Sequence, residues 1–348
     1  MDTHDLDLAP AMEKLIRALP KAELHVHLEG SIVPELALRL ATRRGVKLPG
    51  AEGGVEGVRQ AYRYRSFSDF IEIYIALSSC LDQAEDFALA VTGVAAELGA
   101  QQVRWAEITF TPMTHVRRGV DQDAMLAGLA EGRRRARVEH GVEIGWVFDI
   151  VRSFPEQGPG TLALALKARE QGVIALGVGG PEGPRWPVDR LAPVFARAKA
   201  EGLRSVPHAG EQDGPASIRA NLELLKADRL GHGVRCIEDA ALMRELYDRM
   251  IPLEVCPSSN VVLGFYPDLQ AHPLPKLMAA GLQLCINSDD PPLFGTSLVE
   301  EYRRCAAAYR WTVDDVVAMA AAAVEHSFMS EEGKQRLFAE QEAVANGL

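Results

Sequence analysis

Two histidines lie two positions apart in an apolar segment near the N-terminus. His25 and His27 occur within Glu23–Leu28, a short run that predicts a β-strand. Side chains two positions apart in a strand project to the same face, so the two imidazoles could chelate one metal ion. The pair alone is also consistent with histidines that fill a barrel interior, although two adjacent buried imidazoles without a partner are unfavourable.

Two later apolar segments also end in residues that bind metals or transfer protons. His208 ends one segment and is placed to be a third nitrogen ligand, and Glu211 follows three positions later. Glu211 alone has a simpler interpretation, as an acidic residue that favours the dipole of the next helix. His232 stands between two glycines, which let the backbone approach a ligand. A single histidine in a glycine turn is nevertheless more often structural.

The last apolar segment ends in two adjacent carboxylates, Asp289 and Asp290, followed by Pro291. Vicinal carboxylates at the end of an apolar strand are unfavourable unless they bind a cation or are protonated. Proline stops regular structure directly after them. A turn formed by Asp-Pro explains one aspartate but not the apolar approach to it.

Taken together, these segment ends predict one metal site. They supply three imidazoles and one carboxylate, which form a ligand set for a single zinc ion per chain with a position left for water: His25, His27, His208 and Asp289. Zinc in such a set lowers the pKa of water from about 16 towards about 7 and prepares it to attack an electrophilic carbon.

Other residues near these segment ends suit proton transfer and substrate binding. His232 and Asp289 are suited to take or hold the proton of the attacking water. Glu211 is suited to protonate the leaving nitrogen or its ring if a dry pocket keeps it protonated. Asp290 could hydrogen-bond a substrate. Gly180, in a glycine-rich loop after the fourth segment, could let backbone N–H groups reach a flat ring or could form a tight turn.

The segments that position these residues have the sequence pattern of repeated βα units. Apolar β-branched runs alternate with helical patterns, which predicts an α/β fold with a parallel sheet. Eight such units would close into a TIM (β/α)8 barrel, with an open doubly wound sheet as the alternative. The expected strands are Glu23–Leu28, Val103–Phe110, Glu143–Ile150, Val173–Val178, Arg204–Pro207, Arg229–Gly231, Pro252–Val255 and Leu282–Asn287.

The spacing of the strands predicts an insertion and a C-terminal extension within one domain spanning residues 1–348. About seventy residues separate the first two strands, far more than one helix needs. We interpret residues 31–101 as a helical lid, with helices at Pro34–Arg44, Ser66–Leu81 and Gln83–Leu98 joined by a glycine-rich piece around Gly50–Gly57. Val316–Glu325 and Glu331–Asn346 are expected to be extra C-terminal helices packed outside the barrel.

Composition narrows the class of protein. The chain has 348 residues, 37 basic against 48 acidic side chains and a net charge of −11, which argues against nucleic-acid binding. We find no signal peptide and no apolar stretch of the length that spans a membrane. Five cysteines without a CxxC pair favour a reduced, cytoplasmic protein.

Four motifs together resemble the adenosine deaminase family. They occur in the order of the family and spread over nearly the whole chain: Pro20–Gly30, His208–Glu211, Gly231–Gly233 and Ser288–Pro291. The resemblance implies a zinc-dependent aminohydrolase that attacks C6 of an adenine nucleoside, passes through a tetrahedral intermediate and releases ammonia. It also implies a TIM barrel with a helical lid after the first strand.

The resemblance assigns a role to each matching position. The zinc ligands match His25, His27, His208 and Asp289. Glu211 matches the acid that protonates the purine at N1, and His232 matches the residue that orients and deprotonates the water. Asp290 matches the residue that hydrogen-bonds N7, and Gly180 matches the backbone donor to N3.

Two departures bear on the substrate. Well-known adenosine deaminases have an aspartate that binds the ribose 5′-hydroxyl where this chain has Glu29, and the extra methylene alters the space at that end. The loop Gly177–Glu182 differs from those of the vertebrate-type enzymes and of the adenine deaminases. It is closer to bacterial members that accept 5′-substituted nucleosides, notably 6-aminodeoxyfutalosine in menaquinone synthesis. As a substrate, adenosine fits the sequence as well as 6-aminodeoxyfutalosine does, and free adenine is the alternative.

Other classes fit the sequence less well. Two-metal barrels use a carboxylated lysine at the fourth strand, but no lysine lies between Lys167 and Lys199. Cytidine-type deaminases combine HxE with PCxxC; His27-Leu28-Glu29 matches the first half, and the second does not occur. A catalytically inactive purine-binding barrel remains an alternative, but it would be marked by the loss of an acid or a ligand, and none is lost.

Overall fold

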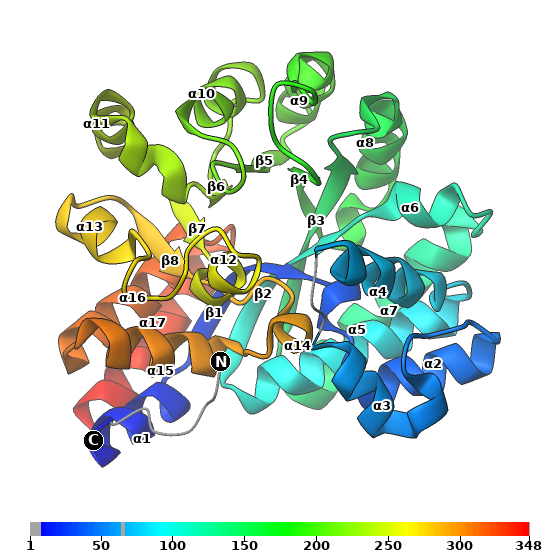
Figure 1. The fold of residues 1–348 in the computed structure, drawn as a ribbon, viewed down its shortest axis with the longest axis horizontal. Helices are drawn as coiled ribbons and strands as arrows, with labels where there is room; N and C mark the ends of the chain where they lie inside the picture. The colour runs from blue at the N-terminus through cyan, green and yellow to red at the C-terminus, as the bar shows by residue number, and fades with distance from the viewer. Residues whose placement is uncertain (1–7, 64–66, 348) are drawn as a thin grey trace.

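The computed structural model describes residues 8–63 and 67–347, and its eight parallel strands form a barrel (Figure 1). The prediction of a TIM barrel is confirmed. Each strand pairs with the next in sequence. The strands are β1 Lys21–His27, β2 Val103–Phe110, β3 Glu143–Val151, β4 Val173–Gly179, β5 Arg204–Ala209, β6 Leu230–His232, β7 Leu253–Val255 and β8 Leu284–Ile286.

The first and last strands meet just beyond the end of β8. Val26 forms a parallel bridge with Asp289, and the backbone N–H of His27 donates to the Asp289 carbonyl at 2.9 Å. The expected strand Leu282–Asn287 extends beyond β8 at both ends, and just past its C-terminal end the Asn287 side chain contacts β1. Its Oδ1 accepts the backbone N–H groups of Leu24 and His25, so the chain is tied to β1 through a side chain.

Helices surround the barrel (Figure 1). The helices that alternate with strands from β2 to β8 are α6 Pro112–Val116, α7 Gln122–His140, α8 Gly158–Lys167, α9 Ala192–Ala200, α10 Pro215–Leu224, α11 Ala240–Asp248, α12 Pro257–Val262 and α13 Leu274–Ala279. The helices outside these units are α1 Pro10–Ala18, α14 Pro291–Phe294, α15 Leu298–Tyr309, α16 Val313–His326 and α17 Glu331–Asn346. Helix α16 packs against β1 and β8, so it covers the junction where the barrel closes.

The segment between β1 and β2 contains more helix than the sequence predicted. It holds a short 3-10 turn η1 Glu29–Ser31, followed by α2 Pro34–Arg44, α3 Gly54–Ala61, α4 Phe67–Ser79 and α5 Ala84–Ala100. The glycine-rich stretch around Gly50–Gly57, expected only to join two helices, overlaps the start of α3. Three residues of the insertion, 64–66, lie outside the described part of the chain.

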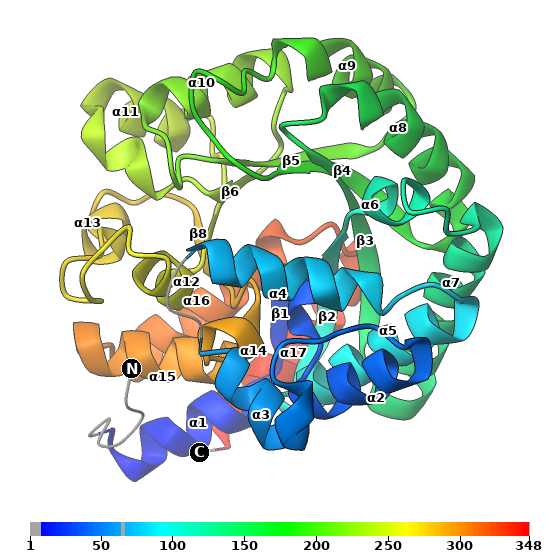
Figure 2. The same cartoon turned by 45° about the vertical axis from the view of Figure 1, so that its right-hand side comes forward.

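The helices of this insertion occupy two different places. Helix α4 contacts η1 and α6, and Phe70 stacks on Phe294 with ring centroids 5.5 Å apart. It therefore lies over the ends of β1, β2 and β8 (Figure 2). Helix α5 instead packs along α7 and β2, where the outer helix of the first βα unit belongs. Among the described residues, no helix combines the length and apolarity needed to cross a membrane.

Candidate active site

Three histidines and one aspartate converge at the carboxyl end of the barrel. His27 Nε2 lies 3.2 Å from His208 Nε2 and 3.2 Å from Asp289 Oδ1. Asp289 Oδ1 is 3.5 Å from His25 Nε2, and one ligand atom of each of the four residues lies within 4.8 Å of the others. The side chains predicted from the sequence as one ligand set therefore meet in space.

Hydrogen bonds turn the free lone pairs of these rings toward one another. His25 Nδ1 donates to Glu254 Oε2 at 2.9 Å, and His208 Nδ1 donates to the Val178 carbonyl at 2.9 Å. In the neutral form of each ring, which is the form that binds a metal, Nε2 is therefore the unprotonated nitrogen, and it faces the cluster. His25 Nε2 is buried and has no hydrogen-bond partner in the described part of the chain. A divalent cation with nitrogen and oxygen ligands fits this arrangement.

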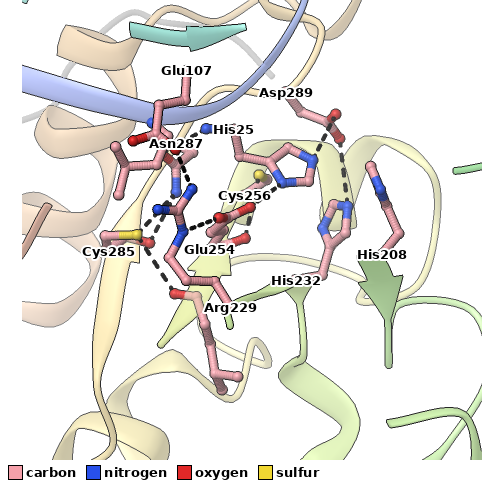
Figure 3. Close-up of polar contacts among 12 residues, drawn as sticks. His25, Glu107, His208, Arg229, His232, Glu254, Cys256, Cys285, Asn287 and Asp289 are labelled. Atoms are coloured by element: carbon pink, nitrogen blue, oxygen red, sulfur yellow. Dashed lines mark hydrogen bonds and ion pairs between the residues drawn. The ribbon is translucent and has the colours of Figure 1, made fainter. Parts of the chain in front are cut away.

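The backbone is constrained at two of the site residues. His232 and Asp289 adopt φ values of 60° and 65°, in the left-handed region that costs a non-glycine residue roughly 1–2 kcal/mol. Asp289 is held by its bridge to β1 and by Ser259 Oγ, which donates to its Oδ2 at 2.7 Å. Such strain persists only where surrounding contacts fix it, and both residues point into the cluster (Figure 3).

Glu211 lies beside His232 in a buried setting. Its Oε1 is 3.5 Å from His232 Nε2, and its side chain is almost fully buried. Burial, followed by the negative charges of Asp289 and Glu182, raises the pKa of Glu211 to about 8. A carboxyl group with this pKa is protonated at neutral pH and can donate a proton.

The loop that carries Glu211 is fixed by Glu182, which sequence reasoning did not single out. Glu182 Oε1 accepts the backbone N–H groups of Glu211 and Gln212 at 2.9 and 3.1 Å, and its Oε2 accepts those of Gly210 and the Ser217 hydroxyl at 2.9 and 2.5 Å. One carboxylate thereby accepts three backbone donors of the turn after β5 and one hydroxyl in the first turn of α10. Because the partners lie about thirty positions along the chain, no local pattern indicates the interaction.

A second carboxylate missed by the sequence supports His25 from inside the barrel. Arg229 Nε donates to Glu254 Oε1 at 2.6 Å, and its Nη2 donates to Glu107. Both acids accept from the one guanidinium in the barrel interior, and Glu254 also accepts from His25 (Figure 3). A charged residue within the apolar run of β7 is a signal that could have indicated Glu254, because an inward charge needs a partner.

The expected substrate-binding residues lie around the same opening. Asp290 is buried, its Oδ1 has no partner among the described residues, and burial together with the Asp289 charge raises its pKa to about 8. Gly30 is required beside it, because a Cβ there would lie 1.6 Å from Asp290 Oδ1. Gly180 has a φ of 84°, a left-handed conformation that favours glycine.

Glu29 is buried and paired on one side only. Its Oε1 lies 3.0 Å from His115 Nε2, a partner that the sequence did not indicate. Its Oε2 is buried without a partner in the described part of the chain. Arg118 Nη2 donates to the other nitrogen of His115 at 3.3 Å. Glu29 thus keeps one acceptor oxygen free at the end of β1.

Comparisons with known proteins identify the family of the chain. A family model described as adenosine deaminase matches residues 20–344. The chain is 38% identical over 341 residues to an aminodeoxyfutalosine deaminase of Streptomyces avermitilis, covering 97% of this chain and 94% of that one. It is 40% identical over 330 residues to an adenine deaminase of Rhodospirillum rubrum, covering 94% and 98%. The solved adenine deaminase of Arthrobacter aurescens superposes with a TM-score of 0.88 at 31% identity, covering 94% of this chain and all of that one.

Proposed function

The chain belongs to the adenosine deaminase family, and we propose that it is a zinc-dependent enzyme that converts the 6-amino group of an adenine nucleoside to a 6-oxo group. The family makes it a hydrolytic deaminase of cyclic amidines. The metal, the roles of the residues and the nucleoside substrate are our proposals. The observation that carries them is the convergence of three imidazoles and Asp289 with free lone pairs facing one another.

The proposed ligands are three imidazole nitrogens and one carboxylate oxygen, from His25, His27, His208 and Asp289. When bound, one zinc ion per chain supplies a Lewis acid that lowers the pKa of a water molecule towards about 7. The buried Glu254–Arg229 pair orients His25 for this role, as hydrogen bonds to the second ring nitrogen do in metal sites.

The proton steps use side chains that lie on the two sides of the cluster. Glu211 donates its proton to N1 of the purine while the water oxygen bonds to C6, and the water gives one proton to the Asp289–His232 side. That proton passes to the amino group, the C6–N bond breaks and ammonia leaves. The remaining C6 hydroxyl returns its proton to Glu211 as the 6-oxo group forms. Asp290 and Gly180 hold the ring at N7 and N3.

A nucleoside with a variable 5′ end is the substrate that we favour. Glu29 keeps one buried acceptor oxygen free, and a hydroxyl of the sugar is a donor that would satisfy it. Two relatives are named for aminodeoxyfutalosine and others for adenine. We therefore propose that the substrate is adenosine or a 5′-modified analogue such as 6-aminodeoxyfutalosine. Free adenine is the alternative substrate, and a non-catalytic purine-binding barrel is the second alternative function.

We also propose that the segment 31–101 works as the lid of a single cytoplasmic catalytic domain spanning residues 1–348. Helix α4 lies over the ends of β1, β2 and β8, which supports a covering role for this part of the insertion. Helix α5 lies in the outer layer, so we assign the covering role to residues before it. We expect a small-molecule partner, and neither nucleic acid nor membrane.

The proposal is tested by an ultraviolet deamination assay with zinc-loaded and chelator-treated protein. The substrates are adenine, adenosine, 5′-deoxyadenosine, methylthioadenosine and 6-aminodeoxyfutalosine. We expect a nucleoside to give the highest kcat/KM, and we expect chelation to abolish turnover and zinc to restore it. A preference for free adenine would overturn the nucleoside assignment. Metal-replete protein that turns over none of these would support the non-catalytic alternative.

A further inference from the structure

A chain of buried polar side chains lies behind His232, on the side away from the ligand cluster. His232 Nδ1 is 3.3 Å from Asn260 Nδ2 in α12. Asn260 Oδ1 is 3.1 Å from His272 Nε2, and the backbone N–H of Leu274 donates to His272 Nδ1 at 3.2 Å. The three side chains are 1%, 0% and 2% exposed, so solvent offers them no alternative partners.

The backbone at the end of this chain sets the direction of every hydrogen bond in it. Leu274 N–H can only donate, so His272 Nδ1 must be an unprotonated acceptor. A neutral His272 then carries its proton on Nε2 and donates it to Asn260 Oδ1. This orients the Asn260 amide so that its NH₂ group faces His232. His232 Nδ1 must therefore accept, because a proton there would meet an amide proton.

We infer that Asn260 and His272 are positioning residues that hold His232 in the tautomer with its proton on Nε2. That nitrogen faces the site, 3.5 Å from Glu211 Oε1 and 3.9 Å from Asp289 Oδ2. His232 therefore enters the reaction as a hydrogen-bond donor, and Asp289 is left to accept the proton of the water. This catalytic consequence rests on the proposed function, whereas the tautomer is a property of the folded protein.

The tautomer is measured directly by two-bond ¹H–¹⁵N correlation spectra of zinc-loaded protein labelled with ¹⁵N-histidine. The spectrum distinguishes a protonated from an unprotonated ring nitrogen. The signal of His232 is the one absent from His232→Gln. We expect the proton on Nε2 and an acceptor shift at Nδ1. A His232 signal with its proton on Nδ1 would overturn the inference, whether or not the protein deaminates any substrate.

The Asn260→Asp variant should reverse the direction of the hydrogen bond between residue 260 and His232. A carboxylate still accepts from His272 but can only accept from His232, so Nδ1 must take the proton and Nε2 loses it. We expect the tautomer to switch and kcat to fall about 10²-fold, the effect of removing one preorganised donor, with KM changed less than threefold. A variant that keeps the original tautomer and kcat would overturn the role of Asn260.

Two further variants separate this role from a structural one. His272→Gln can still donate from its amide to Asn260 Oδ1, so we expect it to keep the tautomer and most of the activity. Gln341→Glu makes the same amide-to-acid change at a different buried amide. Gln341 lies on α17, and its side chain donates to the Pro20 carbonyl. This variant is expected to lower the melting temperature without moving the His232 signal. A tautomer switch in Gln341→Glu would mean that general destabilisation produces the effect, which would overturn the inference.

Discussion

Whether Glu211 carries a proton depends on its immediate surroundings. Burial and nearby negative charge raise its pKa to about 8, so the carboxyl group is protonated at neutral pH. His25 and His208, in contrast, are held by hydrogen bonds at Nδ1 that turn Nε2 of each ring toward the cluster. The chemistry thus depends on the protonation of individual atoms, and substitutions that keep shape but change protonation are the sharpest tests.

Glu211→Gln keeps the size of the side chain but removes the transferable proton. We expect zinc stoichiometry to stay at that of the parent and kcat to fall about 10²–10⁴-fold, the usual contribution of a general acid. Metal analysis and steady-state kinetics on the best nucleoside measure the two quantities. Retention of full deamination would remove Glu211 from the acid role.

Asp289→Ala removes the only carboxylate of the proposed ligand set. Three imidazoles remain, so we expect weaker binding and not a change of geometry elsewhere. The zinc dissociation constant should rise by more than the roughly 10–100-fold typical of a supporting residue. Competition with a chromogenic chelator gives this constant. Unchanged zinc affinity would show that Asp289 is not a ligand.

At the scale of elements, the strands place the ligands and a layer beneath them fixes their orientation. Glu254 on β7 joins His25 on β1 to Arg229 just before β6, so three parts of the barrel are tied together directly below the cluster. The turn after β5 depends in the same way on Glu182 after β4. We assign these carboxylates no direct contact with the metal or the substrate, so their effects should appear through the residues that they hold.

Glu254→Gln weakens the support of His25 while leaving the ligand in place. The neutral amide loses the charge that pairs with Arg229 and faces it with a competing donor. We expect zinc affinity to fall about 10–100-fold. Glu340→Gln is the matched control, because Glu340 also faces an arginine, Arg104 at 3.5 Å, but is half exposed. The zinc affinity of this variant should equal that of the parent. Equal affinities for both variants would contradict the supporting role.

Glu182→Ala removes the acceptor of three backbone donors in the turn that carries Glu211 and of one hydroxyl in α10. We expect kcat to fall up to about 10²-fold, because a catalytic group displaced by about 1 Å loses that much. In the Glu211→Gln background the same change should cost little more, since the two residues act as one unit. Kinetics of the two single variants and the double variant test this, and strictly additive losses would argue for separate roles.

At the scale of the molecule, the ligand cluster links the first strand, the fifth strand and the segment after the last strand. A cation bound there stabilises the folded chain, because the unfolded chain has no assembled site. In the metal-free protein, protons occupy part of the site. Burial alone lowers the pKa of each histidine, but Asp289 and Glu254 raise that of His25 to about 10, and Asp290 and Asp289 raise that of His27 to about 9.

These protons make the stabilisation by zinc depend on pH. The raised pKa values stabilise the metal-free fold fully below about 6.5, and this contribution is lost as pH rises through about 9–10. Zinc must also displace the same protons, so its affinity rises with pH. Displacement of these protons therefore makes the increase in melting temperature at a fixed zinc concentration larger at pH 8 than at pH 6. Scanning calorimetry measures the two increments, and a larger increment at pH 6 would contradict the proposed ligands.

The sequence by itself determined the barrel and the residues of the ligand cluster. The bounds of β2 and α17 follow from local composition, and the alternation of a strand places His25 and His27 on one face whatever surrounds them. The carboxyl ends of parallel strands meet at one opening, so residues at strand ends converge even when they are far apart in the chain. Local rules and the symmetry of the barrel were sufficient for these predictions.

Only the tertiary structure decided what supports those residues. Glu182, Glu254 and Asn260 act on partners 12 to 229 positions away, and the packing of distant loops sets these contacts. The outer position of α5 and the contact of the Asn287 side chain with β1 likewise depend on tertiary packing. Strand periodicity fixes the direction of a side chain, whereas the partner that satisfies a buried polar group is fixed only when distant segments are packed together.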